Sequence, residues 1–371
     1  MSSQKLHIIC SAIPSPPDYG GAIDVYYKLK ALHELGVEII LHCFEYKRRR
    51  ADELKKYCTE IYYYHRKTGL LSQFSFIPYI IKSRQSIALL HRLVKEDFPI
   101  LFEGMHTTAF LQHPDLAGRK QWIRAHNIEH YYYNSLVKTE KSLYKKIYYK
   151  IEAFKLSRYN SIHALADGVF AISQFDATFF EKINKKTILI NAFHGYTHVT
   201  SKIGIGEYAL YHGDLSVAEN NRSAEFLIDI CKNLPFNLII AGKTPKRKLK
   251  KLVKRNNNIY LVDDPNTIEM EDLIQNAGVI LLPATQKTGL RLKLLVSLFS
   301  GRHCIASPEM LVDTGLEKLC HIAENKEEWK QSIQICMKTP FTNIHIVQRE
   351  KLLKNYMDID NARKLTTLIF E

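Results

Sequence analysis

Short runs of apolar residues alternate with segments of helical periodicity along the whole chain. The runs have the length of β-strands and lie at Leu6–Cys10, Val37–Phe44, Glu60–Tyr64, Ile100–Glu103, Gln121–Ala125, Gly168–Ile172, Thr187–Asn191, Tyr208–His212, Asn237–Ala241, Ile259–Val262, Val279–Leu282, Cys304–Ser307 and Cys320–Ala323. Continuous apolar strands separated by helices are typical of parallel sheets that helices cover on both faces. The order predicts an α/β protein with two doubly wound, Rossmann-like halves, which would face each other across a cleft.

The domain organisation follows from this alternation. The clearest helix is expected over Asp24–Leu35, where apolar residues recur on one face. A stretch rich in Thr, Ser and Gly, Tyr196–Gly206, is the best candidate for a linker. We therefore expect an N-terminal domain over residues 1–195 and a C-terminal domain over residues 196–345. Residues 346–371 are expected to be a C-terminal helix that can pack back on the N-terminal domain.

Composition adds a bias toward anionic partners. The 371 residues suffice for about two domains, and 52 Lys and Arg against 38 Asp and Glu give a net charge of +14. Such a balance favours a phosphorylated small molecule, an anionic membrane surface or nucleic acid as partner. Because no recognised nucleic-acid motif is present, we expect no nucleic-acid partner.

The sequence also bears on location. No apolar run reaches the length of a transmembrane helix, and the opening residues are too polar for a signal peptide. The seven cysteines are scattered and contain no C-x-x-C, which indicates buried free thiols in a reducing compartment. We expect a cytoplasmic protein, with peripheral contact at the inner membrane face as a further option.

Two adjacent glycines, Gly20 and Gly21, follow the first predicted strand and a proline-rich loop. Glycines let backbone amides approach a ligand closely, and the start of the following helix offers unpaired N–H groups to an anion. The pair predicts a phosphate cradle. The alternative is a tight turn that requires positive φ angles.

A second motif, Gly289–Ser307, follows the apolar strand V-I-L-L-P and a polar loop. Arg291 and Lys293 fall in the first turn of its predicted helix, where cations oppose the helix dipole unless an anion lies between them and the amides. This conflict with a local rule indicates a phosphate site. The alternative is two solvated basic residues.

A third motif follows the strand Gln121–Ala125 and contains His126, Glu129 and His130. Their spacing is the H-x-x-E-H of one class of zinc peptidase, whose chemistry needs both histidines on one helix face. His126 is predicted at a strand end, so this requirement is expected to fail. The second interpretation is a polar loop that places His126 and Glu129 in the cleft. The third is a helix capped by Asn127 with surface histidines.

Three further patterns are weaker. The G-I-G-E-Y-A of Gly204–Ala209 precedes its strand, whereas a dinucleotide fingerprint follows one. The basic run Pro245–Arg255 is interpreted as the solvated face of an amphipathic helix. Lys141–Lys150 interleaves Tyr with Lys and suits either an anionic membrane or an ordinary surface helix or groove.

Taken together, these segments resemble the retaining glycosyltransferases of the GT-B fold, family four in the usual classification, over nearly the whole chain. The motifs that carry the resemblance are I-P-S-P-P-D-Y-G-G-A, R-A-H-N-I-E-H, A-I-S-Q-F, Y-H-G-D-L-S-V-A-E-N-N, I-I-A-G-K, N-I-Y-L-V-D-D and G-L-R-L-K-L-L-V-S-L-F-S-G. The resemblance implies a hexosyltransferase-type enzyme that moves a sugar from a nucleotide-diphosphate sugar to a glycan or lipid-linked acceptor. It also implies retention of configuration, no metal ion and no cofactor beyond the donor, with a role in surface polysaccharide or glycoconjugate assembly.

The resemblance further implies roles for individual residues. His126 would polarise or hydrogen-bond groups on the acceptor side of the transferred sugar, and Arg291 and Lys293 would hold the leaving diphosphate. The remaining donor-binding positions would be Gly20, Gly21, Gly213, Asn220, Lys243, Asp263, Thr288 and Gly289.

One departure from the family pattern opens an alternative. The family usually has two glutamates eight positions apart in the last motif, and the matching residues here are Thr288 and Val296. Valine cannot accept a hydrogen bond from a ribose hydroxyl. A non-catalytic GT-B protein that binds a glycan or serves as a partner subunit is therefore the second hypothesis, with the zinc peptidase and nucleic-acid binding ranked below it.

Overall fold

The computed structural model describes residues 4–69, 75–284 and 292–371, and these form two compact units. The first unit comprises the described residues up to Gly195 together with Asp358–Glu371. The second comprises the described residues of Tyr196–Met357. The chain therefore leaves the first unit at the start of the predicted linker and returns to it at Asp358.

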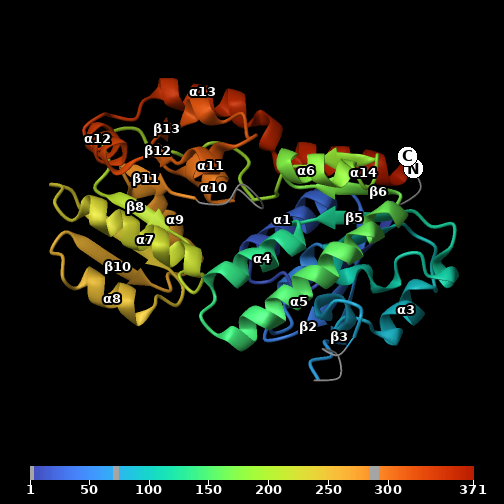
Figure 1. Cartoon of the computed structure of the whole chain (residues 1–371). Coiled ribbons are helices and arrows are strands. Elements are labelled where there is room, and N and C mark those ends of the chain that lie inside the picture. Colours follow the sequence, from blue (N-terminus) through green and yellow to red (C-terminus); the bar gives the residue numbers. More distant parts are fainter. Residues whose placement is uncertain (1–3, 70–74, 285–291) are drawn as a thin grey trace. The chain divides into compact units, whose positions relative to one another are not determined.

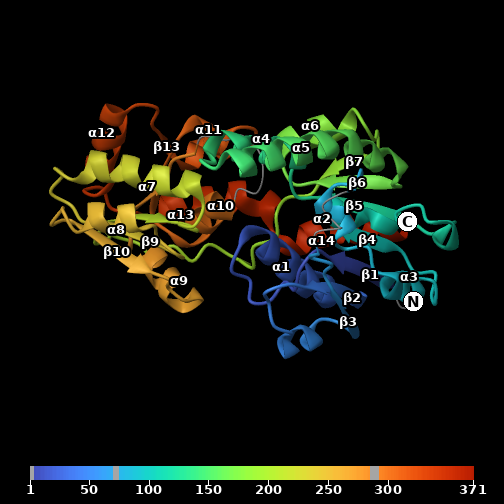
Figure 2. The same cartoon turned by 60° about the horizontal axis from the view of Figure 1, so that its bottom comes forward.

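Within the described residues, the first unit holds a parallel seven-stranded sheet in the order β3-β2-β1-β4-β5-β6-β7 (Figures 1 and 2). Its strands are β1 (Lys5–Cys10), β2 (Glu38–Glu45), β3 (Glu60–His65), β4 (Ile100–Glu103), β5 (Gln121–Ala125), β6 (Gly168–Ala171) and β7 (Thr187–Leu189). Its helices are α1 (Gly20–Glu34), α2 (Tyr79–Lys82), α3 (Ile87–Leu93), α4 (Glu129–Thr139), α5 (Leu143–Tyr159), α6 (Gln174–Glu181) and α14 (Asp358–Phe370).

Successive residues of β1 point to opposite faces of this sheet, as strand geometry requires. Leu6 and Ile8 pack in the core beneath α1 and α14, whereas Ile9 packs in the core beneath α3. Helix α14 lies beside α1 in Figure 2 and buries Leu365 and Ile369 there. Both faces of the sheet are covered, which is why its strands read as continuous apolar runs.

The second unit holds a parallel six-stranded sheet in the order β10-β9-β8-β11-β12-β13, again within the described residues. Its strands are β8 (Ala209–His212), β9 (Leu238–Gly242), β10 (Ile259–Asp263), β11 (Val279–Leu282), β12 (His303–Ala306) and β13 (His321–Ile322). Its helices are α7 (Ala218–Cys231), α8 (Arg247–Val253), α9 (Thr267–Asn276), α10 (Leu292–Ser300), α11 (Pro308–Leu311), α12 (Lys326–Cys336) and α13 (Asn343–Leu353). Among the described residues, the strands match the thirteen predicted apolar runs.

The C-terminal segment differs from the single helix expected over residues 346–371, and the second unit extends beyond the predicted boundary at 345. The C-terminal segment contains two helices, α13 and α14, which are separated by a short 3₁₀ turn at Lys354–Tyr356. The guanidinium of Arg349 is buried in the second unit, where it donates to Ser201 Oγ at 2.8 Å and to the carbonyl of Leu298 at 2.9 Å. These bonds keep α13 with the second unit, whereas the apolar face of α14 packs in the first.

Two minor expectations can be compared directly with the structure. All seven cysteines lie in the described part of the chain as free thiols, and all but the half-buried Cys320 are buried. In the basic run Pro245–Arg255, α8 buries Leu249 and Val253 and exposes its lysines, as an amphipathic helix does. Among the described helices, none is both long and apolar enough for a membrane span.

Candidate functional site

The first unit contains a pocket of about 380 Å³ at the carboxyl ends of β1, β4 and β5. Ligands of open parallel sheets bind at this edge. The lining residues come from the loop after β1, the start of α1, the end of β4 and the start of α4: Cys10, Ser11, Ala12, Pro14, Tyr19, Gly21, Ala22, Val25, Glu103, His106, His126, Asn127, Glu129 and Tyr132. The predicted site residues Gly21 and His126 therefore lie in one pocket.

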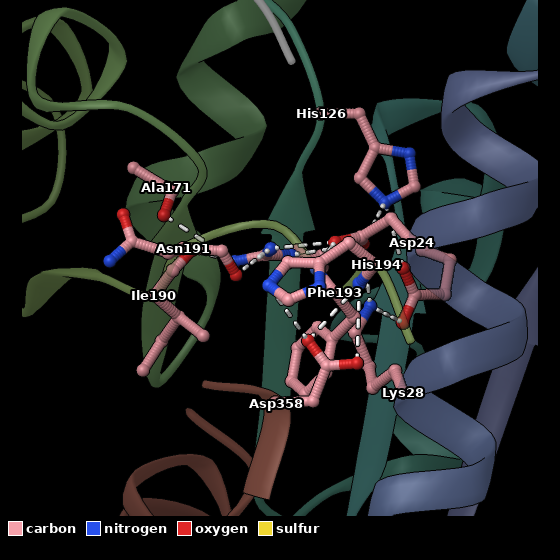
Figure 3. Close-up of polar contacts among 11 residues, drawn as sticks. Asp24, Lys28, His126, Ala171, Ile190, Asn191, Phe193, His194 and Asp358 are labelled. Atoms are coloured by element: carbon pink, nitrogen blue, oxygen red, sulfur yellow. Dashed lines mark hydrogen bonds and ion pairs between the residues drawn. The ribbon is translucent and has the colours of Figure 1, made fainter. Parts of the chain in front are cut away.

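The imidazole of His126 is held by a buried carboxylate. Its Nε2 lies 2.8 Å from Oε2 of Glu103, which ends β4, and 3.5 Å from Oδ2 of Asp24 on α1. Figure 3 shows His126 directed toward Asp24 from the end of its strand. A Cβ atom placed on Gly21 would lie 3.9 Å from Nδ1 of His126 and 3.3 Å from the ring of Tyr19. The absence of a side chain at Gly21 therefore leaves space beside Nδ1, the ring nitrogen that does not face Glu103.

A buried network of charges lies beneath this histidine. Lys28 Nζ donates to Asp24 Oδ2 at 3.0 Å and to Glu103 Oε1 at 2.7 Å, and Arg124 Nη2 donates to Asp24 Oδ1 at 3.0 Å. Burial opposes the ionisation of Asp24, but the charges of Arg124 and Lys28 outweigh it and hold the pKa of this carboxyl well below its usual range. Burial likewise opposes the ionisation of Glu103, and Lys28 and His126 reverse the effect and lower its pKa.

The network connects strands to the loop that follows β7. Arg124 Nη1 donates to the carbonyl of Ile190 at 2.6 Å and its Nη2 to that of Asn191 at 3.0 Å, while Asp24 Oδ1 accepts from the backbone amide of Phe193 at 3.0 Å (Figure 3). Two carboxylates and two cations cancel in formal charge, which is how a fully buried cluster remains tolerable in a low-dielectric interior. The pocket floor is therefore rigidly built from four separate elements.

The return of the chain to the first unit is fixed next to this network. The carboxylate of Asp358, at the start of α14, accepts from the amide of Gly195 at 2.7 Å. It also accepts from the amide of His194 at 3.1 Å (Figure 3). Burial raises the pKa of Asp358 to about 7, although these two amide bonds act against the shift. At neutral pH this carboxyl is therefore close to its titration point.

Neither glycine of the pair occupies a left-handed turn. Gly20 and Gly21 are the first two residues of α1 and do not have positive φ angles, so the turn interpretation is wrong. Their N–H groups belong to the first helical turn, which has no intrahelical acceptor for them. The arrangement is compatible with the predicted phosphate cradle, and the residue that lines the pocket is Gly21.

The H-x-x-E-H motif does not form a metal pair on a helix. His126 precedes α4, whereas His130 lies within it and its Nδ1 is 2.9 Å from Nδ2 of Asn160. The residue at the helix N-cap is Ile128, so the expectation that Asn127 caps the helix is wrong. Burial raises the pKa of Glu129 to about 7, which places a carboxyl that titrates near neutrality in the pocket wall.

In the second unit, three predicted residues meet at the carboxyl end of β8. Lys293, in the first turn of α10, donates through Nζ to Oδ1 of Asn220 at 2.7 Å. A Cβ atom on Gly213 would lie 2.5 Å from Nζ of Lys293, so a side chain at this position would displace the ammonium group. Asn220 Nδ2 donates to the carbonyl of Asp214 at 2.7 Å, which fixes its amide. Burial lowers the pKa of Lys293 to about 8, although the charges of Glu219 and Asp214 act against the shift.

Two other predicted residues lie on the neighbouring strand ends. The carbonyl of Lys243, after β9, accepts from the amide of Leu215 at 2.9 Å, so its loop contacts the loop after β8. Asp263 ends β10 and is exposed, and its carboxylate lies 2.5 Å from Nζ of Lys250. Because β10, β9 and β8 are parallel neighbours, all of these residues share one edge of the sheet.

Three predicted positions, Thr288, Gly289 and Arg291, lie outside the described residues. Val296, at a position where the family that the sequence resembles usually has a glutamate, lies in α10 one turn after Lys293 and is half-buried.

The charged floor of the first pocket is absent from the sequence-based predictions of site residues. A signal for it exists in the sequence. Asp24 and Lys28 are four residues apart on the face of α1 that buries Leu29, Glu103 ends an apolar strand and Arg124 lies inside another. Charged residues at positions that the pattern assigns to the core require partners, and here they are partners of one another.

Two groups of described side chains bring three metal-ligating atoms within 4.8 Å of one another. One consists of Asp24, Glu103 and His126, whose carboxylates already bind the cations Lys28 and Arg124. The donor set is therefore neutralised without a metal ion. The other consists of His303, His321 and Cys336 in the second unit.

The sequence and structure resemble known proteins as follows. No protein-family model matches the sequence. A curated protein of Klebsiella pneumoniae, described as an uncharacterized 44.6 kDa protein in cps region, is 26% identical over 314 residues, which covers 78% of this chain and 79% of the relative.

Solved structures match over the whole length of the chain. A glycosyltransferase from Rickettsia africae ESF-5 is similar with a TM-score of 0.64 and 14% identity, covering 100% of this chain and 98% of that one. TarM matches with a TM-score of 0.66 and 11% identity (100% and 97% covered). A UDP-forming α,α-trehalose-phosphate synthase from Burkholderia vietnamiensis matches with a TM-score of 0.62 and 8% identity (99% and 97% covered). With its two parallel sheets of seven and six strands, the chain has the GT-B fold of the glycosyltransferases.

Proposed function

We propose that this protein is a glycosyltransferase that moves a sugar from a nucleotide-diphosphate sugar to a glycan or glycolipid acceptor. The GT-B fold and the glycosyltransferase structures that share it support the reaction class. The relative encoded in a cps (capsule) region supports a role in surface polysaccharide assembly.

The observation that carries the proposal is the position of Lys293. Its ammonium group lies at the carboxyl edge of the second sheet, next to Gly213, and its hydrogen-bond partner is the neutral amide oxygen of Asn220. The carboxylates of Glu219 and Asp214 act on this ammonium group. Because its hydrogen-bond partner is neutral, we propose that the positive charge is still able to stabilise an anion. In sugar transfer, negative charge develops on the departing diphosphate, and a fixed cation there contributes directly to catalysis.

The first unit supplies the second half of the proposed chemistry. His126 is oriented by Glu103 and turns its other nitrogen toward the space beside Gly21. We assign it a hydrogen-bonding or polarising role toward a hydroxyl of the transferred sugar or of the acceptor. We further propose that configuration at the anomeric carbon is retained and that no metal ion takes part, as the family resemblance implies.

Titration calorimetry with UDP- and GDP-sugars tests the donor assignment. We expect at least one of them to bind, and Lys293→Ala to weaken that binding at least tenfold, because one charged partner of the diphosphate is lost. Lys330→Ala removes a partly exposed lysine of α12 in the same unit and should leave binding unchanged. If no nucleotide sugar binds, the non-catalytic alternative suggested by Thr288 and Val296 is favoured instead.

Two measurements test the proposals that configuration is retained and that no metal ion takes part. NMR of the anomeric proton should show that the transferred sugar has the same anomeric configuration in the product as in the donor. The opposite configuration in the product would contradict retention. Incubation with EDTA should leave turnover unchanged, and a loss restored by Mg²⁺ or Mn²⁺ would contradict metal independence.

A further inference from the structure

Helix α5 presents an apolar stripe to solvent. Leu143, Tyr144, Ile147, Ile151 and Phe154 are between 50% and 77% exposed. Tyr144, Ile147, Ile151 and Phe154 are spaced by three and four residues, which places them along one side of the helix, and Leu143 extends this side at its start. The side turned inward buries Glu152, Ala153 and Leu156. A contiguous exposed stripe of large apolar residues marks an interaction surface, whereas scattered ones do not.

The charge around the stripe has a single sign. The basic residues of α5 are Lys145, Lys146, Lys150, Lys155 and Arg158. The acidic residue of the helix, Glu152, is buried, and its carboxylate accepts from the amide of Tyr79 at 2.8 Å and from Lys155 Nζ at 2.8 Å. The charged side chains on the solvent-facing surface of α5 are therefore all basic, and they lie beside exposed apolar side chains.

The combination of an exposed apolar stripe with basic side chains indicates the kind of partner that α5 can bind. A helix that lies in the interface of a membrane buries its apolar side among the acyl chains and holds its basic side chains at the level of anionic headgroups. Basic residues flanking a stripe oppose self-association, because two copies would bring like charges together. We propose that the stripe on α5, defined as Leu143, Tyr144, Ile147, Ile151 and Phe154, docks the protein on an anionic lipid surface.

The docking helix is packed against a helix that reaches the pocket. Helices α4 and α5 lie side by side (Figures 1 and 2), and the ring of Tyr133 on α4 meets that of Tyr149 on α5 edge-on at 6.0 Å. The first turn of α4 contributes Glu129 and Tyr132 to the pocket wall. The same helical pair thus connects the lipid-facing stripe with the pocket of His126. It follows, resting on the proposed function, that the acceptor is lipid-linked and enters this pocket from the membrane.

Co-sedimentation with vesicles tests the docking without any donor or acceptor. We expect the full chain to bind vesicles of equal parts phosphatidylglycerol and phosphatidylethanolamine at least tenfold better than phosphatidylcholine vesicles. In 1 M salt the Debye length falls to about 3 Å and the preference for anionic vesicles should largely disappear. Failure to bind the anionic vesicles would overturn the proposal, whatever the outcome of the donor experiments.

Matched variants locate the surface. Ile147→Ser/Ile151→Ser/Phe154→Ser and, separately, Lys145→Glu/Lys146→Glu/Lys150→Glu should each reduce vesicle binding at least tenfold. The control Ile344→Ser/Val347→Ser removes side chains that are 70% and 63% exposed on α13, in the other unit, and should bind like the wild type. Unchanged binding by the apolar variant would overturn the proposal. So would a wild-type dimer in sedimentation analysis that the apolar variant converts to a monomer, because the stripe would then be a contact between copies.

The acceptor inference has its own readout. Once a donor is known, the apolar variant should transfer sugar at least tenfold more slowly to a lipid-linked acceptor in vesicles and at the wild-type rate to a water-soluble acceptor analogue. Equal rates with the vesicle-bound acceptor would contradict the inference. Vesicle binding without binding of any nucleotide sugar would refute the proposed function and leave the docking surface intact.

Discussion

Nε2 of His126 lies 2.8 Å from Oε2 of Glu103, and the same carboxylate accepts from the buried ammonium of Lys28 through its other oxygen at 2.7 Å. One glutamate therefore connects the exposed rim of the pocket to its buried charged floor. Removal of His126 should mainly affect turnover, whereas removal of a residue of the buried charge network should mainly affect stability.

His126→Ala should lower kcat about 100-fold, the lower range for loss of a positioned polar or proton-transferring group. Binding of the nucleoside diphosphate should change little, because His126 is assigned to a hydroxyl of the transferred sugar or the acceptor and not to the diphosphate. Steady-state kinetics and calorimetry measure the two effects separately. His65→Ala alters an exposed histidine of β3 and serves as the control. A kcat within twofold of the wild type would remove His126 from the reaction.

Asp24→Asn should destabilise the first unit strongly. The substitution leaves Lys28 and Arg124 buried with Glu103 as their one remaining carboxylate partner in the network, and loss of one member of a buried ion pair costs about 3–5 kcal/mol. Urea unfolding monitored by circular dichroism measures the change. Asp52→Asn removes an exposed carboxylate paired with Lys55 and should change the free energy of unfolding by less than about 0.5 kcal/mol. Equal stability of the two variants would show that the buried network is dispensable.

Activity should decline as pH rises through about 8. Burial lowers the pKa of Lys293 to about 8, so the ammonium loses its charge there while exposed lysines keep theirs. A pH profile of kcat/KM for wild type and Lys293→Arg tests this, because the guanidinium stays charged throughout. If Lys293→Arg retains activity, we expect its kcat/KM not to decline at high pH, whereas that of the wild type should. In an inactive variant, calorimetry of diphosphate binding at pH 7 and pH 9 replaces the kinetic readout, and wild-type affinity that is the same at both pH values would contradict the assignment.

Asp358→Asn should stabilise the protein at pH 8 and not at pH 4. The folded-state pKa of Asp358 is raised to about 7, above the value near 3.9 of an unfolded aspartate, so the folded state binds the extra proton between these values. Its contribution to stability is therefore lost as pH rises from about 4 to 7. The amide oxygen of asparagine can still accept from the N–H of Gly195. Thermal unfolding across this range should show a gap in Tm that opens with pH. A gap independent of pH would contradict the titration.

The fold was predictable because the central strands of both sheets are buried and form continuous apolar runs. The strand Ile100–Glu103 is an example, since it is both a predicted run and β4. Gly21, His126, Gly213 and Lys293 were each predicted as site residues from the sequence. The proximity of Gly21 to His126 and of Gly213 to Lys293 was not predicted and comes from the structure. The ion network was not predicted, because Asp24 and Arg124 are 100 positions apart and pair only once the sheet has assembled. The division of the C-terminal segment into two helices was also not predicted. Arg349 holds α13 in the second unit and the apolar face of α14 packs in the first, and the periodicity of the sequence does not show which unit a helix packs against.

The central claim is sugar transfer from a nucleotide-diphosphate donor, and its most direct test is nucleotide release from a panel of UDP-, GDP- and other nucleotide-sugars with lipid-linked and free glycan acceptors. We predict that one donor is turned over only when an acceptor is present, and that Lys293→Ala slows this release about 100-fold while Lys330→Ala does not. Absence of release from every donor, or release that Lys293→Ala leaves unchanged, would contradict the claim.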